Sequence, residues 1–251
     1  MQHEDWISPE RLVGASRDFL AALRGDLARK AGDDPALSPF VTAMGVLDTS
    51  DQAPPGRAPF DHPNLRHMLP CLARARGSEP LVSFARRAAP LLNWKPVFQD
   101  DKITPVLANG MFAAQAAGLF GTFASERLSV GFFLLMPGIH YPLHTHETAE
   151  IYYTLSGTLE VQHGVDGTPF EVGPGDYSVT PSGRVHALRT GREPVLLMYV
   201  WEGTLACTNW WWSRDARGNW LRTGWLKDDS GVWKMLATEP VSTEAMRRAH
   251  G

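Results

Sequence analysis

The feature that most constrains the fold is a change in the spacing of apolar residues near position 128. From there onward, strand-like segments are separated by Pro- and Gly-containing turn signals at intervals of about 8–12 residues, which is typical of a β-sandwich or barrel. The segments 130–136 and 195–201 are almost continuously apolar, as expected for strands buried on both faces. The Trp-rich stretch 210–233 predicts further strands, and residues 243–248 predict a short terminal helix.

Residues 1–127 have a helical spacing instead. A Ser8-Pro9 cap precedes apolar residues at three- and four-residue steps up to Gly32, which predicts one amphipathic helix. A long loop is predicted at about 33–60. Helices are predicted at about 65–72 and 81–88, and a weaker helix at about 109–120. The sequence therefore predicts a mainly β protein, in which an N-terminal helical extension (1–127) packs on a single barrel (128–251).

Charge and composition exclude several classes of partner. The 24 basic and 27 acidic residues give a net charge of −3, and no basic run is present, which argues against nucleic acid and against an anionic membrane surface. No apolar stretch approaches the roughly 20 residues that span a bilayer, and the N-terminus lacks the pattern of a secretion signal. Cys71 and Cys207 are far apart, so neither a disulfide scaffold nor a thiolate zinc site is expected. We expect a cytoplasmic protein.

Two segments in the predicted barrel combine glycines with potential metal ligands. The first, GIHYPLHTHETAEIYYTLSG, contains His144, His146 and Glu150, and the second, GDYSVTPSGRVH, ends in His186. Their spacings resemble the two motifs of the cupin superfamily. The second motif usually ends in Asn, and here that position is Thr190. The resemblance implies a cupin fold, that is, a double-stranded β-helix or jelly-roll barrel.

The spacing of these residues agrees with a strand that carries ligands on one face. Alternate side chains of a strand share a face, so His144 and His146 point the same way, and Glu150 and Tyr152 are in phase with them. Two or three imidazoles with one carboxylate suit one divalent transition metal per subunit: iron, zinc, manganese, nickel or cobalt. The opposite face needs cover from the N-terminal helices or from a second subunit in a homodimer, because it is apolar: Ile151, Tyr153, Leu155, Leu159 and Val161.

The tyrosines indicate what such a metal site could do. All five lie in the predicted barrel: Tyr141, Tyr152, Tyr153, Tyr177 and Tyr199. Tyr152 follows Glu150 by two residues, so its phenol should lie close to the metal. A nearby cation favours the phenolate, and a phenolate can remove a proton from carbon. Tyr141 is the alternative base.

Beyond the cupin motifs, the chain resembles the cupin-type dimethylsulfoniopropionate (DMSP) lyases. The likeness is densest over about 138–201, and a helical segment before a single barrel is similar to that family as well. The matching positions occur in the family's order and spacing: Tyr141, Pro142, His144, His146, Ala149, Glu150, Tyr152, Gly157, His186 and Trp201.

This resemblance implies a role for each matching residue. Metal ligands would be His146, Glu150 and His186, with His144 either a ligand or just outside the ligand set. Tyr152 would be a ligand or the base, Tyr141 a second candidate base or a substrate-orienting group, and Trp201 a wall of the pocket. The implied substrate is a small zwitterion, cleaved by β-elimination to dimethyl sulfide and acrylate. Its sulfonium would favour aromatic neighbours such as Trp201 and Tyr199.

Other functions stay open on the same motifs. A cupin metal site also suits a dioxygenase, or a lyase or isomerase acting on another small carboxylate, because one fold carries many chemistries. A non-catalytic small-molecule-binding barrel is a further alternative. A tyrosine two residues after the ligand Glu150 favours a proton-abstracting lyase, since a sensor has no need of it.

Overall fold

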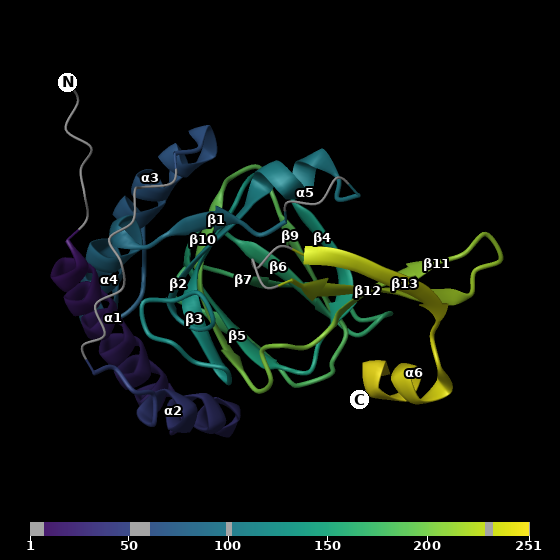
Figure 1. Ribbon diagram of the computed structural model, residues 1–251, viewed down its shortest axis with the longest axis horizontal. Coiled ribbons are helices and arrows are strands. Elements are labelled where there is room, and N and C mark those ends of the chain that lie inside the picture. The colour runs from purple at the N-terminus through teal and green to yellow at the C-terminus, as the bar shows by residue number, and fades with distance from the viewer. Residues whose placement is uncertain (1–7, 51–60, 99–101, 229–232, 251) are drawn as a thin grey trace.

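The computed structural model describes residues 8–50, 61–98, 102–228 and 233–250, and its strands form two antiparallel sheets. The six-stranded sheet has the order β1 (Trp94–Pro96), β2 (Met111–Ala117), β3 (Leu128–Leu135), β10 (Val195–Glu202), β5 (Ala149–Ser156) and β8 (Tyr177–Thr180). The seven-stranded sheet has the order β13 (Trp233–Pro240), β12 (Trp220–Lys227), β11 (Asn209–Arg214), β4 (His140–Thr145), β9 (His186–Thr190), β6 (Leu159–His163) and β7 (Phe170–Val172). The two sheets face each other as a sandwich, which confirms the predicted mainly β, cupin-like class (Figure 1).

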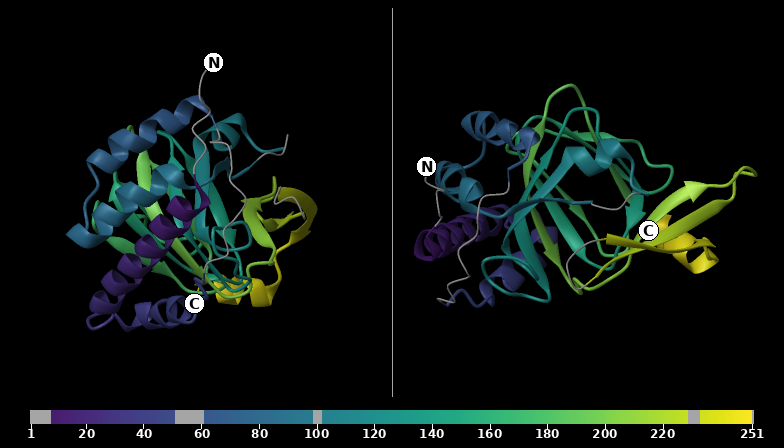
Figure 2. Two further views of the ribbon diagram at one scale, coloured as in Figure 1. Left: turned by 60° about the vertical axis from the view of Figure 1, so that its left-hand side comes forward. Right: turned by 45° about the horizontal axis from the view of Figure 1, so that its top comes forward.

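The helices lie outside the sandwich. They are α1 (Pro9–Lys30), α2 (Ser38–Gly45), α3 (Met68–Ala73), α4 (Glu79–Ala88), α5 (Pro105–Gly110) and α6 (Thr243–His250), with short 3-10 turns η1 (Pro35–Leu37), η2 (Pro63–His67) and η3 (Ala89–Leu91). In the views of Figures 1 and 2, α1 to α4 cover the outer face of the six-stranded sheet. Phe19 of α1 stacks on Phe132 of β3 with ring centres 4.5 Å apart, so this layer is part of the main hydrophobic core.

Local signals fixed the first helix where the sequence predicted it. The Ser8 side chain accepts a hydrogen bond from the Arg11 amide at 3.2 Å, and Pro9 occupies the first turn, where its missing N–H costs nothing. The predicted helices near 65–72 and 81–88 are also present, as η2 with α3 and as α4. At the other end of the chain, α6 and the strands β11 to β13 confirm the predicted Trp-rich strands and terminal helix.

Two sequence predictions for the N-terminal part were wrong. The helix expected over 109–120 is α5 followed by strand β2, because pairing with β1 and β3 overrides the helical propensity of an Ala-rich segment. The loop expected over 33–60 contains η1 and α2, since Pro39 is tolerated in a first helical turn and Phe40 is buried one turn before Met44; residues 51–60 lie outside the described part. The division of the chain at 127/128 stays a proposal. Strands β1 and β2 lie on the N-terminal side of that division but belong to the six-stranded sheet of the barrel.

Strand β5 separates the helical layer from the interior. Its outward side chain Tyr153 lies beneath Lys30 of α1, whose Nζ is 5.5 Å from the ring centre, and the Leu155 carbonyl accepts a hydrogen bond from the Arg76 amide at 2.8 Å. The helical part of the same chain therefore covers the β5 residues of the predicted apolar face, and the predicted homodimer would need a different surface. Leu159 and Val161 do not share that face, because they lie on β6 of the seven-stranded sheet. The other face of β5 carries Glu150 and Tyr152 into the sandwich. Among the described helices, none is long and apolar enough to cross a membrane.

Candidate metal centre

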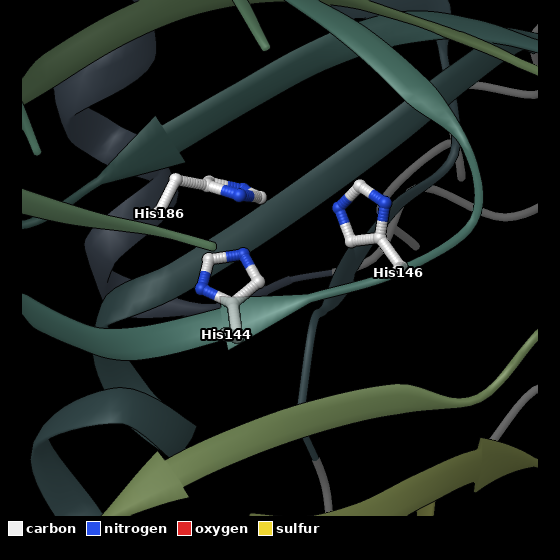
Figure 3. A group of neighbouring side chains, drawn as sticks. All are labelled: His144, His146 and His186. Carbon is white, nitrogen blue, oxygen red and sulfur yellow. The ribbon is translucent and has the colours of Figure 1, made fainter. Parts of the chain in front are cut away.

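Three histidines meet inside the sandwich. His144 of β4 lies directly opposite His186 of β9, and His146 follows two residues after His144. One ring nitrogen from each lies within 4.8 Å of the other two, and all three side chains are buried. Figure 3 shows the rings pointing toward a common centre. This buried triad could hold a metal ion.

Hydrogen bonds set which nitrogen of each ring faces that centre. The Nδ1 atoms of His144 and His186 lie 2.8 and 3.0 Å from the carbonyl oxygens of Pro142 and Arg184. The Nδ1 of His146 lies 3.0 Å from the Thr148 carbonyl oxygen. A carbonyl only accepts hydrogen bonds, so Nδ1 carries the proton in His144 and His186, and Nε2 of the neutral ring presents its lone pair. The Nδ1 of His146 also lies 2.7 Å from the Thr148 hydroxyl, which can donate or accept. Burial lowers the pKa of His144 well below its usual value, which keeps that ring neutral.

Glu150 brings a carboxylate to the same centre. Its oxygens lie 2.8 Å from Nε2 of His186 and 3.3 Å from Nε2 of His146, and its side chain is fully buried. Burial opposes the ionisation of Glu150, whereas His186 and His146, in their protonated forms, hold its pKa well below its usual range. Both carboxylate oxygens and all three Nε2 atoms lack an aligned hydrogen bond among the described residues. A cation would stabilise buried lone pairs gathered around a carboxylate, so the donor set fits a divalent transition metal.

The centre joins the two sheets. His144 and His186 belong to the seven-stranded sheet, whereas Glu150 belongs to β5 of the six-stranded sheet. The bulge in β4 between Tyr141 and His144 breaks the regular register at this point. Residues that are distant in the sheet order are therefore brought within ligand distance across the interior.

Tyr152 lies beside this cluster, as its sequence position predicted. It is fully buried, and its ring centre is 6.5 Å from that of His186. Burial, followed by the negative charge of Glu150, raises the pKa of Tyr152 well above its ordinary value. Its hydroxyl has no aligned hydrogen-bond partner among the described residues. The protein itself thus favours the neutral phenol, and ionisation of Tyr152 depends on a nearby cation.

Tyr141 approaches from the opposite sheet and has a hydrogen-bond donor. Its ring stacks on His144 with centres 3.9 Å apart, and its oxygen accepts a hydrogen bond from Nδ2 of Asn209 at 2.7 Å. Burial raises the pKa of Tyr141, and the bond from Asn209 opposes that rise because it favours the phenolate. The two candidate bases therefore differ, since only Tyr141 has a protein donor directed at its oxygen.

A cavity of about 270 Å³ extends from the two tyrosines toward the surface between the sheets. Trp201 and Tyr199 of β10 line it, directly opposite Glu150 and Tyr152 of β5. Burial raises the pKa of Tyr199 to about 12, and its hydroxyl accepts a hydrogen bond of 3.4 Å from Ser129. Trp201 also lies over His146, with ring centres 4.8 Å apart. The predicted pocket residues thus line one space. The three histidines are not among its lining residues, but Tyr141 and Trp201, which do line it, contact the rings of His144 and His146.

Sequence reasoning identified the cluster and its tyrosines but missed three polar side chains around the cavity. Asn209 begins β11, and Lys95 and Lys227 line the outer part of the cavity from β1 and β12. No motif or spacing marks them. They reach the site only because β11 pairs with β4 and β1 pairs with β2.

Fold and site together define a class: a cupin-like β-sandwich with a buried His cluster that could bind a metal. The comparisons agree with this class and narrow it. A family model described as dimethylsulfoniopropionate lyase matches residues 48–197, which is more than half of the 251 residues. The chain belongs to the DMSP lyase family.

Relatives of known sequence and structure give the extent of the likeness. The chain is 31% identical over 119 residues to DMSP lyase DddQ of Ruegeria pomeroyi, covering 47% of this chain and 58% of that protein. It is 29% identical over 120 residues to DddL of Cereibacter sphaeroides, named as a candidate DMSP lyase, covering 47% and 49%. The chain thus spans about half the length of these curated relatives. The crystal structure of DddQ from Ruegeria pomeroyi DSS-3 superposes with a TM-score of 0.60 at 24% identity, over 78% of this chain and 95% of that one, which shows a shared fold.

Proposed function

We propose that this protein is a metal-dependent lyase that cleaves DMSP by β-elimination to dimethyl sulfide and acrylate. The observation that carries the proposal is the pair of buried phenols, Tyr152 and Tyr141, placed against the cluster of histidines and Glu150 at the end of one cavity. Membership of the DMSP lyase family supports the choice of substrate. The names of the relatives DddQ and DddL agree with it.

In this proposal His144, His146, His186 and Glu150 hold one divalent metal, drawn from iron, zinc, manganese, nickel and cobalt. When bound, such an ion supplies Lewis-acid stabilisation of the negative charge that develops near the substrate carboxylate. The protein contributes fixed ligand orientation, because the carbonyl of Pro142, and its counterparts at the other two rings, hold each imidazole by its Nδ1 atom. The imidazole rings are therefore already oriented before the ion binds.

The proton transfer is assigned to a tyrosine. The phenolate oxygen of Tyr152, or alternatively of Tyr141, takes the proton from the carbon next to the carboxylate. The electron pair left on that carbon forms the double bond of acrylate as the C–S bond breaks. Sulfur keeps the electrons of that bond and leaves as neutral dimethyl sulfide, so no general acid is required.

The wall of the cavity suits the cationic end of the substrate. Trp201 and Tyr199 present aromatic rings to the space in front of Tyr152. Each ring face can attract a sulfonium by roughly 0.5–2 kcal/mol in a desolvated setting. Positioning by these rings would bring the acidic C–H toward the phenols.

The test is detection of both products after metal-loaded protein is mixed with DMSP, with dimethyl sulfide measured in the headspace and acrylate by NMR. We expect equal rates for the two products and loss of both in Glu150→Ala and in whichever of Tyr152→Phe and Tyr141→Phe removes the base. Lys234→Met serves as a control, because Lys234 is exposed on β13 and pairs with Asp228 outside the cavity. Absence of both products with all five metals would reject DMSP as the substrate.

A further inference from the structure

Two lysines line the outer part of the cavity. Lys95 lies on β1 opposite Ala113 of β2, and Ala113 also lines the cavity, so this side of the six-stranded sheet faces the cavity. Lys227 is the last residue of β12 and pairs with Trp233 of β13 in the other sheet. Lys95 is exposed and Lys227 is partly buried, whereas Tyr152 at the inner end is fully buried. The positive charges therefore stand between solvent and the phenols.

The described lining of the cavity is positively charged. Among the described residues that line it, none is an Asp or a Glu. Neither lysine forms an ion pair with another described residue. Their ammonium groups lie over aromatic rings instead: Nζ of Lys227 is 4.9 Å from the Trp233 ring centre, and Nζ of Lys95 is 5.8 Å from that of Phe120.

The surroundings of Lys227 make its charge costly. Burial lowers the pKa of Lys227 to about 8, the positive charge of Lys95 lowers it further, and Cys207 acts in the opposite direction. A partly buried lysine without an ion pair among the described residues is stabilised when an anion binds beside it. The chemistry of the site is thus complementary to a small negatively charged group.

We propose that Lys95 and Lys227 form a recognition site for small carboxylates at the outer end of the cavity. The site attracts the carboxylate end of an entering molecule and repels a cationic end. In combination with the proposed function, on which this part rests, a sulfonium zwitterion enters with its carboxylate first and so reaches the histidine cluster in the orientation that elimination requires. The same lysines hold the acrylate anion as it leaves.

The direct test is binding of propionate to the metal-loaded protein, followed by calorimetry and by tryptophan fluorescence, since Trp233 touches Lys227. We expect propionate to bind more tightly than its neutral amide, propionamide. Lys227→Met should weaken propionate binding about 10-fold, as expected for loss of one charged hydrogen-bonding partner. Lys95→Met should weaken it less because Lys95 is exposed. Lys227→Arg should retain binding, which separates loss of charge from loss of folding.

Lys234→Met is the matched control, because Lys234 lies on the adjacent strand β13, is 56% exposed and pairs with Asp228 outside the cavity. A second readout is the NMR titration of Lys227 after methylation with a ¹³C label, in which saturating propionate should move its pKa upward. Equal propionate binding by the wild type, Lys227→Met and Lys95→Met would overturn the proposal, as would equal binding of propionamide. Propionate binding is measured without turnover, so a protein that binds propionate through Lys227 yet leaves DMSP intact would refute the proposed lyase function alone.

Discussion

The hydrogen bond from Asn209 to Tyr141 offers a way to identify the catalytic base. Asn209 is 2% exposed, its Nδ2 donates to the Tyr141 oxygen at 2.7 Å, and its Oδ1 has no hydrogen-bond partner among the described residues. Asn209→Leu keeps the volume of the side chain and removes the donor. It therefore tests whether a negative charge develops on the Tyr141 oxygen during the reaction.

The size of the effect follows from these contacts. Asn209→Leu removes one buried hydrogen bond, which contributes about 1 kcal/mol to stability. It also removes a buried carbonyl without a hydrogen bond, which costs about 1–3 kcal/mol, so the free energy of unfolding should change little. A hydrogen bond to a charged group contributes about 1.5–3 kcal/mol. If Tyr141 is the base, its loss should lower the rate at a fixed pH roughly 10- to 150-fold. Because loss of the donor raises the pKa of Tyr141, the rise of activity with pH should move about 1–2 units toward higher pH.

The assay is the initial rate of dimethyl sulfide release across the pH range for the wild type, Asn209→Leu and Ser129→Ala. Ser129→Ala removes the hydroxyl donor near Tyr199 and should leave the profile in place. The double variant Tyr141→Phe/Asn209→Leu should have the same rate as Tyr141→Phe alone, because Asn209 acts through the Tyr141 oxygen. An unchanged pH profile in a folded, metal-loaded Asn209→Leu protein would refute Tyr141 as the base and assign that role to Tyr152.

Three further predictions concern the metal cluster, the second phenol and the packing of the sheets. Glu150→Gln removes the carboxylate of the cluster and should weaken metal binding by at least ~10-fold, measured by competition with a chelator; full metal retention would contradict the ligand set. Tyr152→Phe removes a buried hydroxyl without a hydrogen bond, so the free energy of unfolding in denaturant should stay the same or rise by up to about 1 kcal/mol, and a loss above about 2 kcal/mol would be inconsistent with that contact pattern. Gly131→Ala places a Cβ 1.9 Å from the Ala114 carbonyl oxygen and should destabilise the protein by about 1–3 kcal/mol or more. Gly14→Ala, in open space on α1, should stabilise it by about 0.5–1 kcal/mol; the opposite order in thermal unfolding would count against the packing described here.

What the sequence predicted well depends on local spacing. His144, His146, Glu150 and Tyr152 lie within nine positions, so strand alternation alone places them on one side of neighbouring segments. The cap at Ser8 likewise acts over three residues. Such features need no knowledge of which strand pairs with which.

What the sequence did not predict depends on distant pairing. Residues 111–117 are rich in alanine and favour a helix in isolation, yet β3 offers hydrogen bonds along one whole edge and Gly131 lets the two backbones approach closely. Asn209 reaches Tyr141 from 68 residues away, through the pairing of β11 with β4. No spacing in the chain encodes that contact.

A metal ion held by ligands from both sheets would also resist the opening of the sandwich. His144 and His186 anchor it to one sheet and Glu150 to the other, so the sheets could not separate without breaking ligand bonds. An ion that binds the folded state alone adds about 4 kcal/mol to the free energy of unfolding at a free concentration 1,000 times its Kd. The stability of the folded protein would then depend on the concentration of that metal in its surroundings. Without the ion, the protein would lose both its activity and the link between the two sheets, and the inactive form would be the one most readily unfolded and degraded.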